Sequence, residues 1–399
     1  MNILNIEHVS KLYGDKWIFD DISCGIQEGE KIGIIGINGT GKTTRLRIIA
    51  GTEEPDQGQV VRQNGAKLAY LTQLHEFPEE ETVLSYVVSG SAAVKGSWGG
   101  TDAGDVDILE HEARSMLNTL GILEHDAKMG TLSGGQKKRA ALARTLLLPS
   151  DILILDEPTN HLDEDMIRWL EQYLRRYRGT VITVTHDRYF LDQVTNRILE
   201  ISHGKLYSYA GDYSRFLELK AQREEMELAS DRKRRSVLRM ELEWAARGCR
   251  ARSTKQRARL DRLEALKAGK TPLKEQNVEM DSIETRMGKK TIEFHHVSKT
   301  IEGRLLINDF DHIVLRDQRL GIIGPNGCGK STLLKMADGL ILPDSGEIQI
   351  GETIRIGYLA QNVPDMDGRQ RVIDYIREVA EYVPTKEGRI TASQMLENF

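Results

Sequence analysis

Residues 36–43 read Gly-Ile-Asn-Gly-Thr-Gly-Lys-Thr. This stretch fits the pattern G-x-x-x-x-G-K-[ST], in which the glycines let the backbone curl until its N–H groups face a phosphate. Residues 31–35, Lys-Ile-Gly-Ile-Ile, predict a buried strand before it, and a helical pattern follows it to about Ala50. In that position the helix N-terminus and Lys42 attract phosphates, and the hydroxyl of Thr43 is placed to hold Mg²⁺.

The same pattern occurs a second time at 324–331, Gly-Pro-Asn-Gly-Cys-Gly-Lys-Ser, 288 residues after the first copy. Residues 319–323, Arg-Leu-Gly-Ile-Ile, predict another short buried strand before this loop. The same offset aligns Gln73 with Gln361, so the chain is predicted to be a tandem repeat of a large α/β unit. Glycine-rich turns also occur without a nucleotide, but two copies in the correct context favour nucleotide binding.

The composition is that of an ordinary globular protein, and 399 residues are enough for two or three domains with their own cores. The N-terminus has no basic region followed by an apolar run, and no eighteen apolar residues occur together. Both observations argue against a signal peptide and a membrane span. Cys24, Cys249 and Cys328 are far apart, which argues against a disulfide framework or a structural metal site and indicates a reducing cytoplasm.

Two further segments end in polar residues that suit phosphate chemistry. Residues 152–155 run into Asp156 and Glu157, which predicts a buried parallel strand with both acids at its C-terminal end. One carboxylate can hold Mg²⁺ there, and the next can polarise an attacking water. Residues 181–185 predict a second such strand, which ends at His186, a residue able to hydrogen-bond a γ-phosphate. Taken singly, either segment could also be a strand that ends in solvated or structural side chains.

Two other features are ambiguous from the sequence alone. Residues 132–136, Leu-Ser-Gly-Gly-Gln, precede a helical stretch at 137–148 and could form an anion cradle or only an N-cap. Tyr13 lies ahead of the first loop, where its ring could stack on a nucleotide base or pack as an ordinary tyrosine. In the second unit, Ile301 takes the position of Tyr13.

The segment from about 213 to 268 contains almost no proline or glycine, and its leucines recur at helical spacing. It is predicted to form two helices hinged near 247–249. Between positions 232 and 270 there are 14 Lys or Arg and four Asp or Glu, although the whole chain has a net charge of −5. A basic helical hairpin would attract a phosphate backbone, and a solvated charged spacer is the alternative. The candidate nucleic-acid contacts are Arg247, Arg250, Arg252, Lys255, Arg257 and Arg259.

Together these residues resemble an ATP-binding cassette protein. The motifs that follow the first phosphate loop occur in the order typical of that family: Gln73, LSGGQ at 132–136, ILILDEP at 152–158, NHLD at 160–163 and His186. The two fused cassettes, the charged helical linker and the lack of membrane spans resemble the ABC-F family, whose members act on ribosomes. Within it, the linker sequence ELEWAARGCRARSTKQRARLDRL is similar to the Uup-like branch.

The resemblance implies an α/β fold of two P-loop NTPase cassettes joined by an α-helical hairpin, with ATP and Mg²⁺ as ligands. It implies that Glu157 polarises the attacking water and that His186 lies at the γ-phosphate. The residues that it implies for Mg²⁺ are Thr43, Gln73, Asp156, Ser331 and Gln361. The residues that it implies for ATP are Tyr13, Gly36, Asn38, Gly39, Thr40, Gly41, Lys42, Thr43 and Thr44 in the first unit, Gly324, Asn326, Gly327, Gly329, Lys330, Ser331 and Thr332 in the second, and Ser133, Gly134, Gly135 and Gln136 of LSGGQ.

The predicted organisation is a first cassette at 1–212 with a helical subdomain at about 75–148, a basic linker hairpin at 213–288, and the N-terminal part of a second cassette at 289–399. The second copies of LSGGQ, Asp156 and His186 would lie beyond residue 399, so the second cassette is expected to be incomplete. Because cassettes of this family pair head to tail around ATP, neither composite site is complete in one chain. We therefore expect weak or no ATPase activity from the monomer, and self-association through uncovered apolar surface.

The leading functional hypothesis is a cytoplasmic ATP-driven factor that binds the ribosome and contacts tRNA in the P site through its basic linker. The competing hypotheses are the ATPase subunit of a membrane transporter and a truncated ATP-binding clamp that holds RNA without turnover. A transporter subunit has little use for a basic hairpin between its cassettes. The clamp would bind RNA in a manner that depends on salt but not on ATP.

Overall fold

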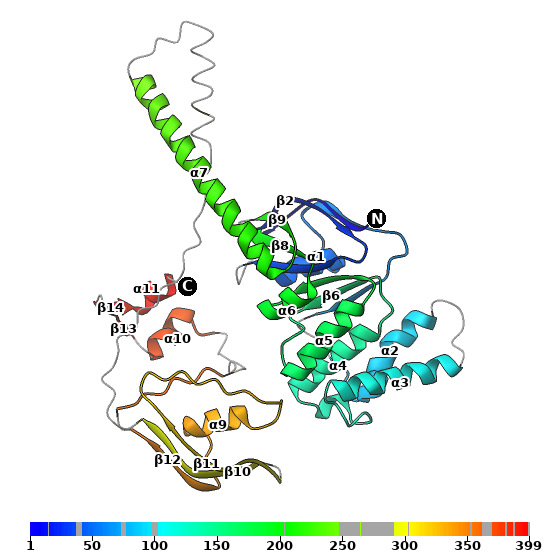
Figure 1. The fold of residues 1–399 in the computed structure, drawn as a ribbon, viewed down its shortest axis with the longest axis vertical. Helices are drawn as coiled ribbons and strands as arrows, with labels where there is room; N and C mark the ends of the chain where they lie inside the picture. The colour runs from blue at the N-terminus through cyan, green and yellow to red at the C-terminus, as the bar shows by residue number, and fades with distance from the viewer. Residues whose placement is uncertain are drawn as a thin grey trace. The chain divides into compact units, whose positions relative to one another are not determined.

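The computed structural model describes residues 1–14, 16–36, 42–72, 77–96, 103–202, 204–246, 264, 291–301, 303–351, 353–360, 369–379, 381–385 and 388–397 of the chain. It divides into two compact units, Met1–Thr271 and Pro272–Phe399 (Figure 1). Both units begin with antiparallel strands in the same spatial order, as expected for a tandem repeat.

The first unit is built on a six-stranded sheet with the order β5-β6-β7-β3-β8-β9. Its central strand β3 (Lys31–Gly36) pairs in parallel with β7 (Thr180–Val184) on one side and β8 (Arg197–Ser202) on the other. The remaining strands are β5 (Leu68–Leu71), β6 (Ile152–Asp156) and the antiparallel edge strand β9 (Lys205–Ala210). Since β3, β6 and β7 run in parallel, the residues that follow them meet at one edge of the sheet.

Helices and a second sheet flank this sheet in the first unit. The second sheet has the order β2-β1-β4 and consists of β1 (Asn2–Tyr13), β2 (Lys16–Gln27) and β4 (Gln57–Arg62). The helices that follow in chain order are α1 (Lys42–Ala50), α2 (Val83–Gly96), α3 (Ala103–Thr119), the 3₁₀ turn Met129–Thr131, α4 (Gly134–Leu147), α5 (Glu164–Arg176) and α6 (Arg188–Val194).

The two faces of the parallel sheet bury alternate residues. Ile32 and Ile154 pack in one apolar cluster with residues of α1 and of β1 and β2. On the opposite face, Leu153 and Val181 pack in a cluster with residues of α4, α5 and α6. Burial on both faces is the reason why these strands appear in the sequence as unbroken apolar runs.

Two helices differ from their sequence predictions. The helix predicted at 137–148 begins three residues earlier, at Gly134, because Ser133 caps it. The helix expected at about 107–120 begins at Ala103, and α2 was not predicted as a separate helix. The helix expected to end at about Ala50 is confirmed as α1.

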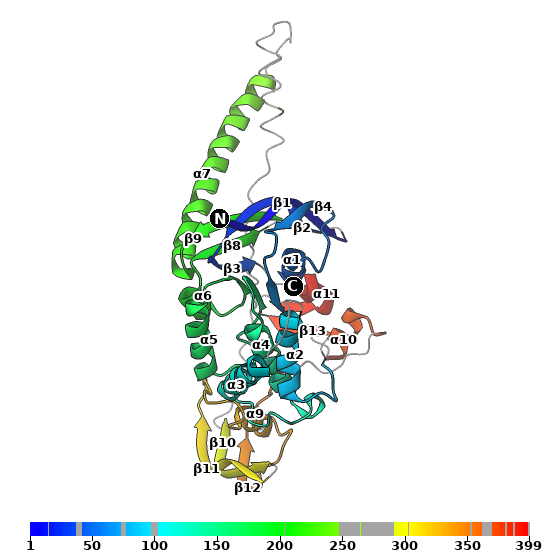
Figure 2. The same ribbon diagram turned by 90° about the vertical axis from the view of Figure 1, so that its right-hand side faces the viewer.

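The linker begins with α7 (Tyr213–Ala246), whose 34 residues span about 51 Å at the rise of an α-helix. Figure 1 and Figure 2 show α7 running past β8 and β9 and extending beyond the strands of the first unit. The predicted hinge at 247–249 and the second linker helix lie outside the described residues.

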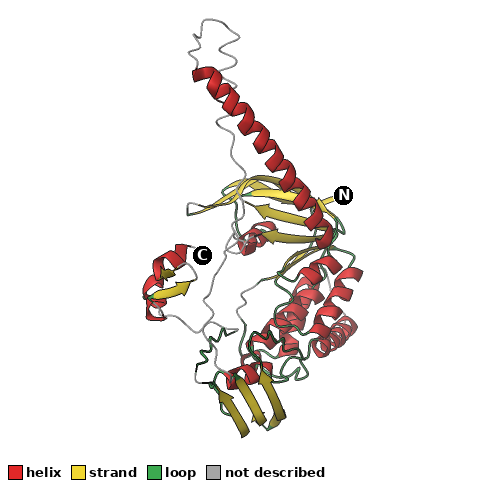
Figure 3. Cartoon of the chain, turned by 60° about the vertical axis from the view of Figure 1, so that its left-hand side comes forward, coloured by secondary structure: helices red, strands yellow, loops and turns green. Residues whose placement is uncertain are grey.

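The second unit contains a three-stranded antiparallel sheet with the order β11-β10-β12, which α9 covers (Figure 3). Its strands are β10 (Ile292–Ile301), β11 (Arg304–Val314) and β12 (Ser345–Ile350), and α9 is Lys330–Ala337. The chain continues through α10 (Val372–Val379), the hairpin of β13 (Tyr382–Thr385) and β14 (Gly388–Thr391), and α11 (Ala392–Glu397).

The predicted strand at 319–323 is wrong, because these residues form no strand in the structure. Ile34 is 1% exposed in β3, whereas the equivalent Ile322 is 42% exposed. In the first unit, β7 and β8 supply the hydrogen bonds on both sides of β3. In the part of the second unit that the structure describes, no strand pairs with 319–323 on either side.

Gly33 and Gly321 occupy equivalent positions and provide a matched test of this difference. A Cβ added at Gly33 would lie 2.8 Å from Ile198 Cδ1 and from Leu191 Cδ2, whereas one at Gly321 would meet nothing within 4 Å. We predict that Gly33→Ala lowers the free energy of unfolding of the first unit by about 1–3 kcal/mol through overpacking. Gly321→Ala should change unfolding by less than about 0.5 kcal/mol in urea denaturation. Equal losses in the two variants would contradict the described packing.

Candidate nucleotide-binding site

The first phosphate loop lies between β3, which ends at Gly36, and α1, which begins at Lys42. The predicted strand, loop and helix therefore follow one another in the structure. Thr44 in the first turn of α1 is partly buried. The predicted ATP ligands Asn38, Gly39, Thr40 and Gly41, and the side chains of Lys42 and Thr43, lie outside the described residues.

Asp156, Glu157 and His186 meet at the C-terminal edge of the sheet. Asp156 ends β6 and is buried, opposite Val184 of β7. Glu157 has a left-handed backbone conformation, with φ of 51°, and its amide donates a hydrogen bond to the carbonyl of Val184 at 2.8 Å. Nε2 of His186 lies 3.4 Å from Oε1 of Glu157. The structure thus brings together the acid and the histidine that the sequence places 29 positions apart.

Ser133 caps α4 with reciprocal hydrogen bonds. The amide of Ser133 donates to Oε1 of Gln136 at 2.9 Å, and the amide of Gln136 donates to Oγ of Ser133 at 3.3 Å. The N-cap interpretation of LSGGQ is therefore confirmed. Ser133 and Gly134 are exposed, so the amides of this helix start are open to an anion, and the cradle stays a prediction.

The LSGGQ helix also contacts the segment that follows β6. Nζ of Lys138 donates to Nε2 of His161 at 3.0 Å. Burial, followed by the charges of Lys138 and Arg139, lowers the pKa of His161, so its ring is neutral at pH 7 and can accept this bond. A hollow of about 30 Å³, enough for about one water, lies between these elements and is bordered by Asp156 and Thr72.

Tyr13 lies at the end of β1 and is 54% exposed. Its hydroxyl donates to Oε1 of Glu53 at 3.2 Å, and Nζ of Lys11 lies 6.0 Å from the ring centroid. The exposed ring is compatible with stacking on a base, which stays a prediction.

The second phosphate loop is described in full. Gly324, Gly327 and Gly329 have φ angles of 155°, 77° and 101°, a region that glycine adopts without strain. A Cβ added at Gly324 would lie 2.9 Å from Sγ of Cys328. The ammonium of Lys330 donates to the carbonyl of Gly324 at 2.6 Å, and α9 begins at Lys330. The loop therefore curls at a helix N-terminus, which is the geometry that a phosphate cradle needs.

The residues present fit ATP and Mg²⁺. The glycine conformations of the second loop leave room for close approach of a phosphate, because no Cβ projects there. The buried carboxylate of Asp156 and the exposed Ser331 supply oxygen ligands of the kind that Mg²⁺ prefers. Asn326 and Thr332 lie in and directly after the same loop. The candidate residues outside the described ranges are Gln73, Gln361, Arg247, Arg250, Arg252, Lys255, Arg257 and Arg259.

Two neighbours of the site were not predicted from the sequence. Burial, followed by the charge of Asp156, raises the pKa of Tyr70 to about 12, so this phenol of β5 is neutral beside β6. Arg139 is buried, and burial lowers its pKa, although the charge of Asp163 opposes that shift. The available signal was an arginine directly before the apolar residues 140–143, but this pattern does not reveal which acid lies near Arg139.

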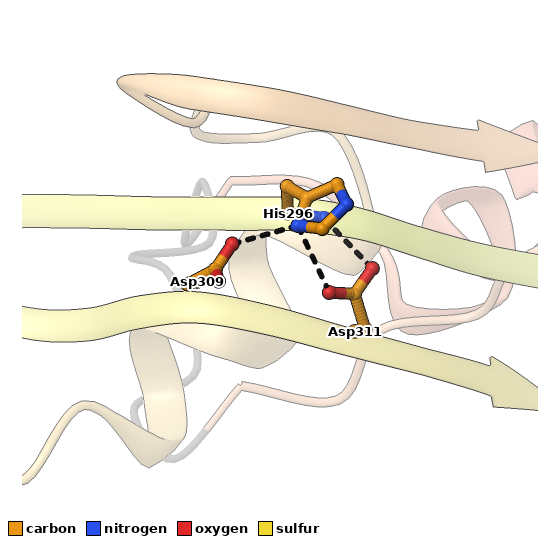
Figure 4. Close-up of side chains that lie close together, drawn as sticks. All are labelled: His296, Asp309 and Asp311. Carbon is orange, nitrogen blue, oxygen red and sulfur yellow. Dashed lines mark hydrogen bonds and ion pairs between the residues drawn. The ribbon is translucent and has the colours of Figure 1, made fainter.

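A separate cluster lies on the antiparallel sheet of the second unit (Figure 4). Nδ1 of His296 lies 2.8 Å from Oδ1 of Asp309 and 3.2 Å from Oδ2 of Asp311. The hydrogen bond with Asp309 and the charge of Asp311 raise the pKa of His296. Nδ1 of His8 lies 2.7 Å from Oδ1 of Asp21 at the equivalent positions of the first unit. Since the pair recurs, an ion pair between neighbouring strands accounts for the cluster.

A larger hollow of about 750 Å³ in the first unit is bordered by α3, the end of α4 and α5. Trp169, Tyr173 and Tyr177 form a ladder along α5, with ring centroids 5.5 and 6.5 Å apart. The hydroxyl of Tyr173 donates to the carbonyl of Leu146 at 2.9 Å, and that of Tyr177 bonds to Ser150. None of the predicted site residues lines this hollow.

Comparison with known proteins agrees with these motifs. A family model described as ABC transporter matches residues 19–160 and 307–395, and another with the same description matches 199–282. The chain is 44% identical to the uncharacterized ABC transporter ATP-binding protein YfmR of Bacillus subtilis, over 100% of this chain and 68% of that protein. It is 35% identical to the energy-dependent translational throttle protein EttA of Mycobacterium tuberculosis, over 100% of this chain and 76% of that protein. The solved structure of an ATP-binding subunit of an ABC transporter matches 52% of this chain and 90% of the subunit's own chain, with 20% sequence identity and a TM-score of 0.46.

The matches cover both cassettes and the linker between them. The chain belongs to the ABC-F family. The predicted fold class of tandem ATP-binding cassettes is confirmed, and so is the assignment of this ABC-F protein to a class of ATPases. None of the helices that the structure describes is both long enough and apolar enough to cross a membrane.

The cap of α4 provides a test of the LSGGQ segment in this ABC-F protein. Ser133→Ala removes the acceptor for the amide of Gln136, so the free energy of unfolding of the first unit should fall by about 1 kcal/mol. Thermal unfolding monitored by circular dichroism measures this loss, and Ser133→Thr, which keeps a hydroxyl, is the control. An unchanged unfolding temperature in the alanine variant would show that the cap contributes nothing to stability.

Proposed function

We propose that this ABC-F protein is an ATP-driven factor that binds the ribosome in the cytoplasm and contacts P-site tRNA or rRNA through its basic linker. The observation that carries the proposal is the linker charge, 14 Lys or Arg against four Asp or Glu between positions 232 and 270. The length of α7 supports the proposal, because this helix places the basic part of the linker far from the first cassette. The proposal is also supported by a relative that matches the chain over its whole length and is named an energy-dependent translational throttle protein.

The proposed roles of the site residues follow from their positions. Glu157 would orient and polarise the attacking water, and His186, 3.4 Å from it, would hydrogen-bond the γ-phosphate. Asp156 and Thr43, with Gln73, would hold Mg²⁺, which offsets the charge that develops on the phosphates when it is bound. In the second unit, Ser331 and Gln361 would take the corresponding metal positions, and Lys330 would reach the outer phosphates.

The cassettes are proposed to use ATP as a switch of affinity. Closure of the cassettes around ATP would favour the ribosome-bound state, and hydrolysis would favour release. For such a switch, the ligand must bind one conformation more tightly than the other. The second partner of each closed site would be LSGGQ, whose helix start is exposed in the first unit.

Ribosome pelleting tests the proposal. The Glu157→Gln chain, which should bind ATP without hydrolysing it, is expected to pellet with ribosomes only when ATP is present. Charge reversal of the linker by Arg250→Glu, Arg252→Glu, Arg257→Glu and Arg259→Glu should weaken pelleting at least about tenfold, because contacts with phosphate groups are lost.

The matched control reverses four exposed cations of the first cassette, Arg176, Arg178, Arg188 and Lys205, and changes the net charge equally. This control should pellet like the parent. Equal loss in both charge-reversed chains would contradict a specific role of the linker. Binding that falls with salt but ignores ATP would indicate a passive RNA clamp instead.

The rate of ATP hydrolysis provides a further prediction. Residues 1–399 contain one LSGGQ and one ILILDEP, so a polypeptide limited to these residues offers one motif of each kind to its two phosphate loops. Turnover per chain should be low and should rise with protein concentration if first cassettes of two chains pair. A steady-state phosphate-release assay measures this dependence. Turnover that is independent of concentration and similar to that of a two-cassette relative would contradict the prediction.

A further inference from the structure

The base of α7 meets the sheet beside the strand that leads into the first phosphate loop. Ile35, the residue before the end of β3, is paired in register with Glu200 of β8. Ile35 belongs to an apolar cluster that also contains Tyr213, Phe216 and Leu219 from the first two turns of α7. The linker helix is therefore packed in the same cluster as the residue that directly precedes Gly36.

A buried carboxylate fixes the same contact electrostatically. Glu200 is 3% exposed, and its Oε1 lies 2.8 Å from Nζ of Lys220. Its Oε2 lies 2.8 Å from NH1 of Arg223 and accepts a hydrogen bond from the hydroxyl of Tyr209 at 3.0 Å. The guanidinium carbon of Arg223 lies 3.8 Å from the ring centroid of Tyr207. Charge-assisted bonds from two elements to one buried acid hold those elements in a defined orientation.

The protonation states agree with this arrangement. Burial, followed by the charge of Glu200, raises the pKa of Tyr209, so its hydroxyl keeps the proton that it donates. Burial, the largest single effect, lowers the pKa of Arg223, but the charge of Glu200, the hydrogen bond to it and the neighbouring tyrosines together raise this pKa above its usual value. At neutral pH the carboxylate of Glu200 is therefore contacted by three donors. They are the guanidinium of Arg223, the ammonium of Lys220 and the neutral phenol of Tyr209.

The geometry converts a small shift at the base into a large one at the tip. From Arg223 to Ala246 the helix continues for 23 residues, or about 35 Å. A rotation of about 10° at the base would therefore move the far end by about 6 Å. A straight helix transmits such a rotation without absorbing it in loops.

We propose that the contact formed by Ile35, Glu200, Lys220 and Arg223, which we call the α7 joint, couples the nucleotide state of the first phosphate loop to the direction of the linker. A phosphate bound at the N-terminus of α1 shifts the end of β3, which directly precedes the phosphate loop. β8 follows β3 through their shared hydrogen bonds, and Glu200 carries α7 with it. This inference rests on the proposed function, because it supplies the means by which ATP would move the RNA-contacting linker.

The test measures the direction of α7 in the full chain without ribosomes. Spin labels are placed at Gln172→Cys on α5 and Met240→Cys on α7, both exposed, in a Glu157→Gln background with the three native cysteines replaced by serine. Pulsed electron paramagnetic resonance reports the label distance with and without ATP and Mg²⁺. The background is expected to show an ATP-dependent shift of several Å, on the scale of the rotation estimated above.

Two variants disturb the joint from its two sides. Glu200→Gln removes the buried charge from β8, and Arg223→Gln removes one of its partners from α7. Each should lose at least half of the ATP-dependent shift while its dissociation constant for ATP stays within about twofold of the parent. Asp231→Asn is the matched control, because Asp231 pairs with Arg234 and Arg235 of its own helix and lies outside the joint. This control should keep the full shift.

A full shift in both joint variants would overturn the proposal, as would the absence of a shift in a parent chain that binds ATP. If Glu200→Gln does not fold, as judged by thermal unfolding, Arg223→Gln decides the outcome, because it leaves the buried acid paired with Lys220. The proposed ribosomal function can be contradicted independently of the α7 joint. An ATP-dependent shift in a chain that does not pellet with ribosomes would contradict that function and leave the joint supported.

Discussion

The parallel pairing of β3 with β7 and β8 is the constraint on which the first cassette depends. It buries β3 on both faces and brings the end of β3 and His186 to the edge where Asp156 ends β6 and Glu157 follows it. The second unit shows the converse. Its segment at 319–323 has similar residues, but none of the strands described in the second unit pairs with it, and Ile323 is 91% exposed. A hydrophobic strand of a parallel sheet is therefore specified by its neighbours as much as by its own sequence.

The same sheet joins nucleotide chemistry to the linker. One face packs against α1, and the opposite face carries Glu200 with the cations of α7. A buried ion pair adds little stability relative to apolar residues, because desolvation of the charges offsets their attraction. Its position at the base of a helix about 51 Å long favours a role in orientation rather than in stability.

Local sequence patterns were sufficient for much of the fold. The apolar runs 152–155 and 181–185 predicted strands that the structure confirms as β6 and β7, and the pairs Gly36 with Lys42 and Gly324 with Lys330 marked the loops. The failures involve contacts between distant residues. Nothing near Lys138 indicates that it will meet His161, and the acid within Ile-Leu-Glu-Ile at 198–201 does not reveal its partners on α7. The strand expected at 319–323 failed because its pattern says nothing of the strands that must flank it.

The central claim is that the first phosphate loop and the linker helix act as one structural unit. Hydrogen–deuterium exchange of the full chain, with and without ATP and Mg²⁺, tests it most directly. The account predicts that ATP slows amide exchange in residues 32–36 and also in the first turns of α7, at 213–223. Slower exchange confined to the phosphate loops, with 213–223 unchanged, would contradict it.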